Sequence, residues 1–162
     1  VVFQPLQREQ FDQFGDDAFG DVGSHPPILQ AGVGERADPP QLLPLHAAMD
    51  AALGAAGLPD IGHFFPNTSE EFRGADSLQL ARVVTRELKQ RGYELVNLDV
   101  MVLAEVPKVG PHREKMRVNL AEVFEIPLEN VALKATTMEK MGFVGRREGV
   151  AVIASALARR TS

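Results

Sequence analysis

The stretch from Leu95 to Val106 alternates strictly along the chain. Its even-numbered positions carry only apolar residues, whereas its odd-numbered positions mix Asn, Asp and Glu with Leu and Met. Because successive side chains of a strand point to opposite faces, this pattern predicts a β-strand with one core face, ended by Pro107. A strand of this kind requires other elements to cover that face.

Helical patterns surround this strand. Three stretches repeat apolar residues every three or four positions, and they cover residues 42–57, 75–91 and 111–127. In the first, Pro44 suits an opening turn and Gly57 suits an end. In the second, Asp76 or Ser77 is a typical N-cap and Gly92 closes the helix.

Two further strands are predicted, at residues 131–137 and 150–157. Residues 58–74 read as a loop, and residues 1–44 are poorly organised, with only 27–33 suited to a short strand. After that start the order is helix, helix, strand, helix, strand, strand. This order predicts an α/β (α+β) two-layer sandwich with helices on one face of the sheet.

Composition limits the classes of function. The 162 residues fit a single domain, 1–162, with an ordinary 44% hydrophobic and 24% charged content. A net charge of −5 argues against general nucleic-acid binding. No apolar run has the length of a membrane span, and no signal peptide is evident at the start. The chain lacks cysteine, which suits a cytoplasmic protein.

The stretch KATTMEKMGFVGRREG, Lys134 to Gly149, concentrates groups that suit phosphate chemistry. Hydroxyls and cations bind phosphate oxygens, a carboxylate among them suits a divalent ion, and glycines allow backbone N–H groups to approach an anion. The residue types alone leave a second interpretation open, in which the stretch is a strand end, a turn and another strand with surface charges.

Three stretches together resemble one family. LHAAMDAALGAAGLPDIGHFFPNT (45–68), AEVPKVGPHREKMR (104–117) and KATTMEKMGFVGRREG (134–149) are similar to 2-C-methyl-D-erythritol 2,4-cyclodiphosphate synthases. The resemblance covers about residues 45–159, and the first 44 residues match poorly. It implies a mixed four-stranded sheet with helices on one face and a homotrimer with sites between neighbouring subunits.

The resemblance also implies an activity, that of a phosphorus-oxygen lyase in non-mevalonate isoprenoid biosynthesis. The substrate would be a cytidine diphosphate, 4-diphosphocytidyl-2-C-methyl-D-erythritol 2-phosphate. One of its own phosphate oxygens would attack the β-phosphorus, and CMP would be released. The implied cofactors are divalent metal ions, namely zinc with magnesium or manganese.

By the same resemblance, Asp50 would receive the ribose hydroxyls and residues 104–110 would hold the cytosine mainly through backbone groups. Thr137 would be catalytic by stabilising transition-state charge, and Glu139 would bind magnesium. The full set of implied substrate-binding residues is Asp50, Asp60, Ile61, Gly62, Phe65, Pro66, Asn67, Thr68, Ser69, Ala104, Glu105, Val106, Pro107, Lys108, Val109, Gly110, Thr136, Thr137, Met138, Glu139, Phe143 and Arg146.

The implied zinc site centres on His46. Family members complete it with an Asp-x-His pair, and here Asp12 stands near the aspartate position while Phe14 replaces the histidine. Asp21 and His25 do not restore the pair, because three residues separate them rather than one, and catalytic zinc normally takes three protein ligands. The chain as written therefore predicts weak zinc binding and weak cyclisation.

Two alternatives to a fully active enzyme follow. The chain is either a zinc-deficient relative that keeps the trimer and the CMP pocket, or a synthase whose natural first 44 residues differ from those given.

Overall fold

The computed structural model describes residues 2–5, 39–66 and 76–161. Among the residues singled out above, Asp12, His25, Asn67, Thr68 and Ser69 lie outside this part of the chain. The short strand predicted at 27–33 also lies outside it.

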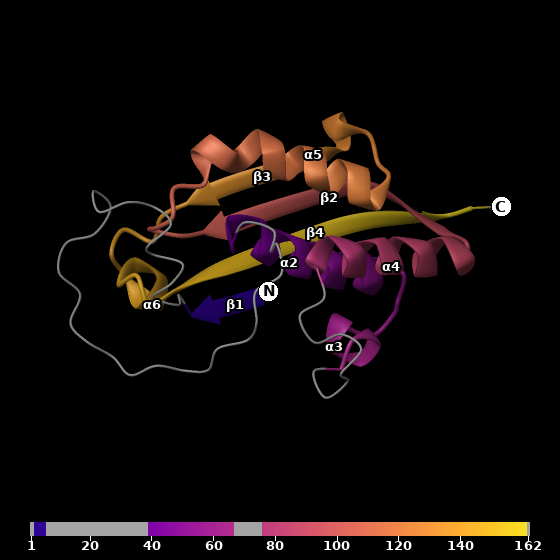
Figure 1. Cartoon of the computed structure of the whole chain (residues 1–162), viewed down its shortest axis with the longest axis horizontal. Coiled ribbons are helices and arrows are strands. Elements are labelled where there is room, and N and C mark those ends of the chain that lie inside the picture. The colour runs from indigo at the N-terminus through magenta and orange to yellow at the C-terminus, as the bar shows by residue number, and fades with distance from the viewer. Residues whose placement is uncertain (1, 6–38, 67–75, 162) are drawn as a thin grey trace.

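The described strands form one mixed sheet in the order β1-β4-β2-β3 (Figure 1). Their bounds are β1 Val2–Pro5, β2 Tyr93–Leu103, β3 Val131–Thr136 and β4 Gly149–Arg160. Strand β4 runs antiparallel to both neighbours, whereas β2 and β3 are parallel. The parallel pair matters for function, because its two carboxyl ends meet at the same edge of the sheet.

The long helices are α2 Pro39–Ala55, α4 Ser77–Gln90 and α5 Arg113–Phe124. Two single-turn helices, α3 Ile61–Phe64 and α6 Gly142–Gly145, and two 3-10 turns, Gly110–His112 and Leu128–Asn130, lie in the connections. The long helices pack on one face of the sheet, which confirms the predicted α/β class. No helix in the described ranges has both the length and the hydropathy that crossing a bilayer requires.

The core lies between the helices and the even-numbered face of β2. Leu98, Val100 and Val102 are buried there, as the alternation predicts, against Met49 and Leu53 of α2. Burying one such side chain stabilises the fold by roughly 1.5–3 kcal/mol. The helical layer is thus held by apolar area rather than by surface ion pairs.

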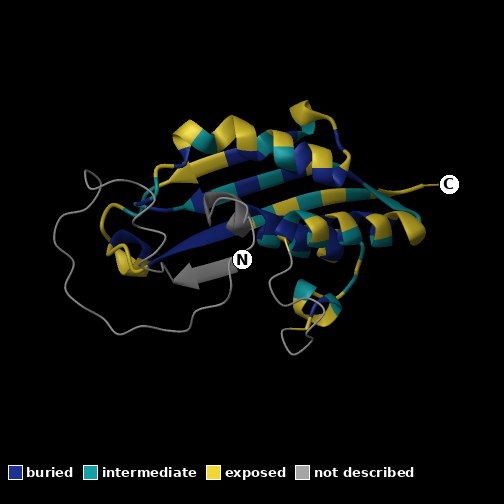
Figure 2. Ribbon diagram, viewed as in Figure 1, coloured by how far each residue is buried: buried dark blue, intermediate teal, exposed yellow. Residues whose placement is uncertain are grey.

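The opposite face of the sheet stays open in the single chain. Met101 is half-buried, while Ile153 and Leu157 of β4 are 43% and 59% exposed. Figure 2 shows this mixture of intermediate and exposed colouring along β4. On the same face Lys134 of β3 pairs with Asp99 of β2 at 2.7 Å. Large apolar side chains beside a charge pair are typical of a surface that another chain covers.

The edge strand β3 is covered by two arginines of α5. Arg113 Nε donates to the Leu133 carbonyl at 2.8 Å, and Arg117 Nε donates to the Val131 carbonyl at 2.9 Å. These carbonyls point away from β2, so they would otherwise be unpaired acceptors at the edge of the sheet.

The structure corrects several of the predicted element bounds. Helix α2 begins at Pro39, so Pro44 lies inside the helix rather than in its opening turn. The predicted loop 58–74 contains α3, which is too short to show a periodicity. Strand β2 ends at Leu103, three residues before the alternation ends, and a bend follows at 105–107. Helix α5 is shorter than the predicted 111–127, and β4 extends beyond the predicted 150–157 at both ends.

The predicted helix ends hold. Asp76 is the N-cap of α4, accepting from the Leu78 N–H at 3.1 Å. Gly57 and Gly92 follow α2 and α4 with φ of +71° and +73°, a conformation that favours glycine.

Candidate active site

The parallel pairing of β2 and β3 brings two distant stretches together. Leu103 lies opposite Thr136, and one residue later the Ala104 N–H donates to the Thr136 carbonyl at 3.0 Å. The loop 104–110 therefore leaves the sheet beside the turn that follows β3. Carboxyl ends of neighbouring strands are where ligands bind in open α/β sheets.

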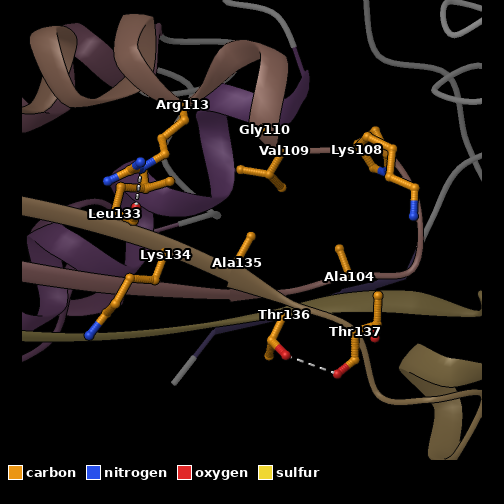
Figure 3. Close-up of a pocket in the computed structure, with 11 residues that line it drawn as sticks. Ala104, Lys108, Val109, Gly110, Arg113, Leu133, Lys134, Ala135, Thr136 and Thr137 are labelled. Atoms are coloured by element: carbon orange, nitrogen blue, oxygen red, sulfur yellow. Dashed lines mark hydrogen bonds between the residues drawn. The ribbon is translucent and has the colours of Figure 1, made fainter.

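A pocket of about 560 Å³ lies between this loop and β3 (Figure 3). In Figure 3 the Val109 side chain lies between the loop and the strand, and the two threonines lie at the end of β3. The lining residues are Ala104, Pro107, Lys108, Val109, Gly110, Arg113, Leu133, Lys134, Ala135, Thr136 and Thr137. The lining thus combines mainly apolar residues with the hydroxyls of Thr136 and Thr137 and the cation of Lys108.

The sequence identifies most of this lining but not all of it. Arg113, Leu133, Lys134 and Ala135 line the pocket and are absent from the predicted substrate-binding set. The parallel register was the missing signal, because it places the whole end of β3 beside the loop. Glu105 and Val106, both predicted to bind substrate, do not line it, and Val106 is buried.

The turn after β3 carries the groups that suit phosphates and a divalent ion. Thr137 Oγ1 donates to Glu139 Oε1 at 2.7 Å, and Thr136 Oγ1 donates to the Thr137 carbonyl at 3.3 Å. Glu139 is exposed, so its carboxylate is open to solvent as well as to the hydroxyl. Hydroxyl and carboxylate oxygens at this spacing suit a hard cation and the phosphate oxygens that it bridges.

The backbone of this turn is unusual. Glu139 and Lys140 have φ of +50° and +66°, two left-handed residues in succession and neither of them glycine. The Met138 and Lys140 N–H groups both donate to Glu105 Oε1, at 3.0 and 3.2 Å. The sequence predicted that backbone N–H groups here would bind an anion. Two of them do, and the anion is a carboxylate of the same chain.

Gly145 of α6 lies directly against this turn. A Cβ atom at this position would lie 2.2 Å from the carbonyl carbon of Lys140, closer than atoms can approach. The second glycine of the GFVG sequence is therefore required by the close approach of two backbones.

Arg146 and Phe143 complete the stretch after the turn. Arg146 makes a two-pronged ion pair with Glu148, Nε to Oε1 at 2.7 Å and a terminal nitrogen to Oε2 at 3.0 Å. The hydrogen bond and charge of Glu148 raise the pKa of Arg146. Phe143 is exposed on α6. Both residues follow the turn after β3 in the chain and lie outside the pocket lining.

A second group of predicted residues gathers around α3. Asp60 is the N-cap of α3, with its Oδ1 accepting from the His63 N–H at 3.1 Å. Asp50 of α2 accepts from the Ile61 N–H at 2.8 Å. Phe65 is buried behind this turn, while Gly62 and Pro66 are exposed. In Figure 1, α3 lies apart from the carboxyl ends of β2 and β3. Asp60 therefore does not line the pocket of its own chain.

His46 lies one helical turn before Asp50 on α2. Its Nε2 is 3.1 Å from Ser77 Oγ at the start of α4, and the ring is half-buried. Desolvation by burial lowers the pKa of His46, and the charge of Asp50 opposes that shift. The imidazole is therefore held neutral near pH 7, the form in which histidine binds a metal.

The predicted metal ligands are not assembled within the described part of the chain. That part contains no cluster of three His, Asp or Glu side chains suited to a metal ion. Asp12 lies outside it, so His46 and Glu139 are the two predicted ligands whose positions are known.

Comparison with known proteins gives the family. A model of the YgbB family matches residues 43–159. The chain belongs to the YgbB family. A 2-C-methyl-D-erythritol 2,4-cyclodiphosphate synthase of Marinobacter nauticus is 50% identical over 118 residues, covering 73% of this chain and 74% of that protein. The synthase of Edwardsiella ictaluri is 53% identical over 113 residues, 70% of this chain and 72% of that protein.

Solved structures of the YgbB fold agree. A bifunctional IspDF from Campylobacter jejuni matches with a TM-score of 0.71 and 38% identity, over 74% of this chain and 32% of that longer one. An IspF–CDP complex from Plasmodium falciparum matches with a TM-score of 0.65 and 28% identity, over 74% of this chain and 72% of that one. The predicted family resemblance is thus confirmed over nearly the range expected.

Proposed function

We infer that this chain is a 2-C-methyl-D-erythritol 2,4-cyclodiphosphate synthase. It cyclises 4-diphosphocytidyl-2-C-methyl-D-erythritol 2-phosphate and releases CMP in non-mevalonate isoprenoid biosynthesis. Relatives of this name at 50% identity or more support the assignment. The single structural observation that carries it is the pocket between loop 104–110 and the end of β3, next to the turn that carries Thr137 and Glu139.

The reaction is an intramolecular phosphoryl transfer. An oxygen of the 2-phosphate attacks the β-phosphorus and forms a new P–O bond. The bond from the β-phosphorus to the bridging oxygen breaks, and that oxygen leaves on the α-phosphate of CMP. Such a transfer depends on positioning and charge stabilisation more than on a covalent nucleophile.

The pocket residues divide this work. Loop 104–110 holds the cytosine through backbone groups, and Lys108 neutralises phosphate charge. Thr136 and Thr137 donate to phosphate oxygens by turning their hydroxyl protons away from the Thr137 carbonyl and from Glu139, and Thr137 also donates to the charge that develops in the transition state. Only hydroxyl rotation is needed, because the turn that carries these donors is already folded.

The residues present fit one of the two implied metals. The exposed Glu139 carboxylate next to a hydroxyl fits magnesium or manganese, which would supply Lewis-acid stabilisation to phosphate oxygens when bound. For zinc, His46 lies in no cluster of three potential ligands within the described part of the chain, whereas a catalytic site takes three.

We also infer a homotrimer with shared sites. Ile153 and Leu157 leave apolar area on the open sheet face, which a second copy would cover. The separation of α3 from the pocket supports a site completed by Asp60 of one subunit and Lys108 of another. Sedimentation should give a trimer at micromolar concentration, and a stable monomer would contradict this. Relatives that are bacterial biosynthetic enzymes, together with the lack of cysteine, support a cytoplasmic location.

The test is CMP release by the purified chain with magnesium or manganese, beside a metal analysis of the same sample. Stoichiometric cyclic product by phosphorus NMR would support the synthase. CMP binding without turnover, in protein free of zinc, would support the zinc-deficient relative, which the comparisons do not favour. No CMP binding at all would exclude both.

A further inference from the structure

The Glu105 carboxylate connects the two halves of the pocket. Glu105 lies in the base-binding loop, and its Oε1 accepts from the Met138 and Lys140 N–H groups, 33 and 35 residues further along the chain. Two N–H donors converging on one half-buried carboxylate oxygen make charge-assisted hydrogen bonds, which are stronger than neutral ones. One side chain therefore spans from the loop to the turn.

The turn depends on this support because its backbone is intrinsically unfavourable. Glu139 and Lys140 are both left-handed, and non-glycine residues adopt that region only when surrounding contacts impose it. The two bonded amides bracket Glu139, and the first of them directly follows Thr137. Because these hydrogen bonds fix the two amides, they also fix the backbone that carries Thr137 and Glu139, the two side chains that the inferred reaction uses.

We propose that Glu105 is a positioning residue that couples base binding to the placement of Thr137 and Glu139. The loop that holds the cytosine and the turn that holds the phosphates are set relative to each other by this one carboxylate. The Glu105 side chain is bonded to the turn and does not line the pocket. The proposal rests on the proposed function, since it assigns the loop to the base and the turn to the phosphates. Its signature is a fall in kcat without a matching loss of affinity for CMP.

The first test uses the free protein, so it does not depend on substrate. Amide hydrogen exchange at Met138 and Lys140 is compared by NMR in wild type, Glu105→Ala, Glu105→Gln and the control Glu122→Ala, an exposed residue of α5. Glu105→Ala should accelerate exchange roughly tenfold or more, because it removes the shared acceptor. Glu105→Gln keeps an acceptor oxygen and should stay near wild type, as should the control. Unchanged exchange in Glu105→Ala would overturn the proposal.

The second test separates positioning from general stability. For Glu105→Ala we expect kcat to fall roughly 10- to 100-fold, as small misplacements of reacting groups do, while the Kd for CMP changes less than about threefold. Glu105→Gln should recover most of the rate. Equal losses of kcat and CMP affinity, accompanied by a lowered Tm, would overturn the proposal in favour of a merely structural role.

If wild type neither binds CMP nor turns over, the proposed function fails and the coupling fails with it. The exchange data would still decide, independently, whether Glu105 holds the turn. The two failures are therefore distinguishable.

Discussion

Two turns that carry predicted substrate-binding residues are each held by a carboxylate from a neighbouring element. Asp50 of α2 holds the start of α3 through one N–H group, that of Ile61. Glu105 holds the turn after β3 through two, those of Met138 and Lys140. The family resemblance predicts that Asp50 and Glu105 both bind substrate. In the structure, both carboxylates accept hydrogen bonds from backbone N–H groups.

The two turns differ in how far their own residues stabilise their backbone geometry. Helix α3 has ordinary helical geometry and its own N-cap, Asp60, so one added bond is enough to place it. The turn after β3 has two left-handed residues in succession and relies on Glu105 and on the close approach of Gly145. A turn that must hold strained geometry needs more external contacts than one built from a regular element.

The largest effect should come from the side chains that the β3 turn presents. Thr137→Ala and Glu139→Ala should each lower turnover roughly 10²- to 10³-fold, as removal of a transition-state donor does, with CMP affinity largely kept. Steady-state kinetics and calorimetry with CMP measure the two quantities. Exposed Glu129 supplies the control, Glu129→Ala. Wild-type turnover in either variant would show that the assigned roles are wrong.

The next prediction concerns Gly145, which lies directly against the same turn. Gly145→Ala places a methyl group where the Lys140 backbone lies, so we expect a loss of roughly 1–3 kcal/mol in the free energy of unfolding, together with lower turnover. Gly54→Ala is the matched control, since a Cβ there meets nothing within 4 Å. Replacing this glycine, which lies in the last turn of α2, should instead stabilise by up to roughly 0.5–1 kcal/mol. Urea titration distinguishes the two, and a neutral Gly145→Ala would mean that the turn moves aside freely.

A smaller effect is expected at the other turn. Asp50→Ala should lower the affinity for ribose-containing ligands about tenfold, the scale of one hydrogen bond to a charged group, because α3 loses its tie to α2. Asp50→Asn keeps an acceptor oxygen and should lose less. Exchange at the Ile61 amide should rise in Asp50→Ala while that at Met138 stays unchanged. Faster amide exchange at both Ile61 and Met138 would show that the two turns are not stabilised independently.

The smallest effect concerns pH. Burial lowers the pKa of His46 below its ordinary value of 6.5, so the unfolded state binds this proton more readily than the folded state. The contribution of neutral His46 to stability is present above pH 6.5 and is lost as pH falls through that value towards the lower folded pKa. In the presence of a metal chelator, the free energy of unfolding of the wild type should fall more steeply between pH 7 and pH 5 than that of His46→Gln. Equal slopes would contradict the shift.

Periodicity was sufficient for elements that bury one face. The alternation around Val100 predicts β2, and the stripe of Val84 and Leu88 predicts α4, because burial repeats with the period of the element. Periodicity fails for α3 and α6, each four residues long, which are held by caps and close contacts instead of a stripe. It also fails to place Pro44, which lies inside α2 because the helix starts earlier.

For the site, residue type singled out the turn after β3 and the resemblance singled out the loop 104–110. Neither could show that Glu105 bonds to the turn, because that contact joins residues more than 30 positions apart and depends on the parallel register of β2 and β3. The pocket roles of Arg113 and Lys134 were hidden for the same reason. Long-range geometry, rather than chemistry, was the missing information.

The two arginines that cover β3 have a consequence for aggregation. Four residues of helix rise about 6 Å, and two residues of strand rise about 6.6 Å, so Arg113 and Arg117 can reach alternate carbonyls of one strand in step. Two of the acceptors that an incoming strand would use at this edge are therefore already bonded. A partially unfolded or foreign chain finds a poorer template there on which to extend the sheet, so the arginines disfavour fibre-like growth along β3.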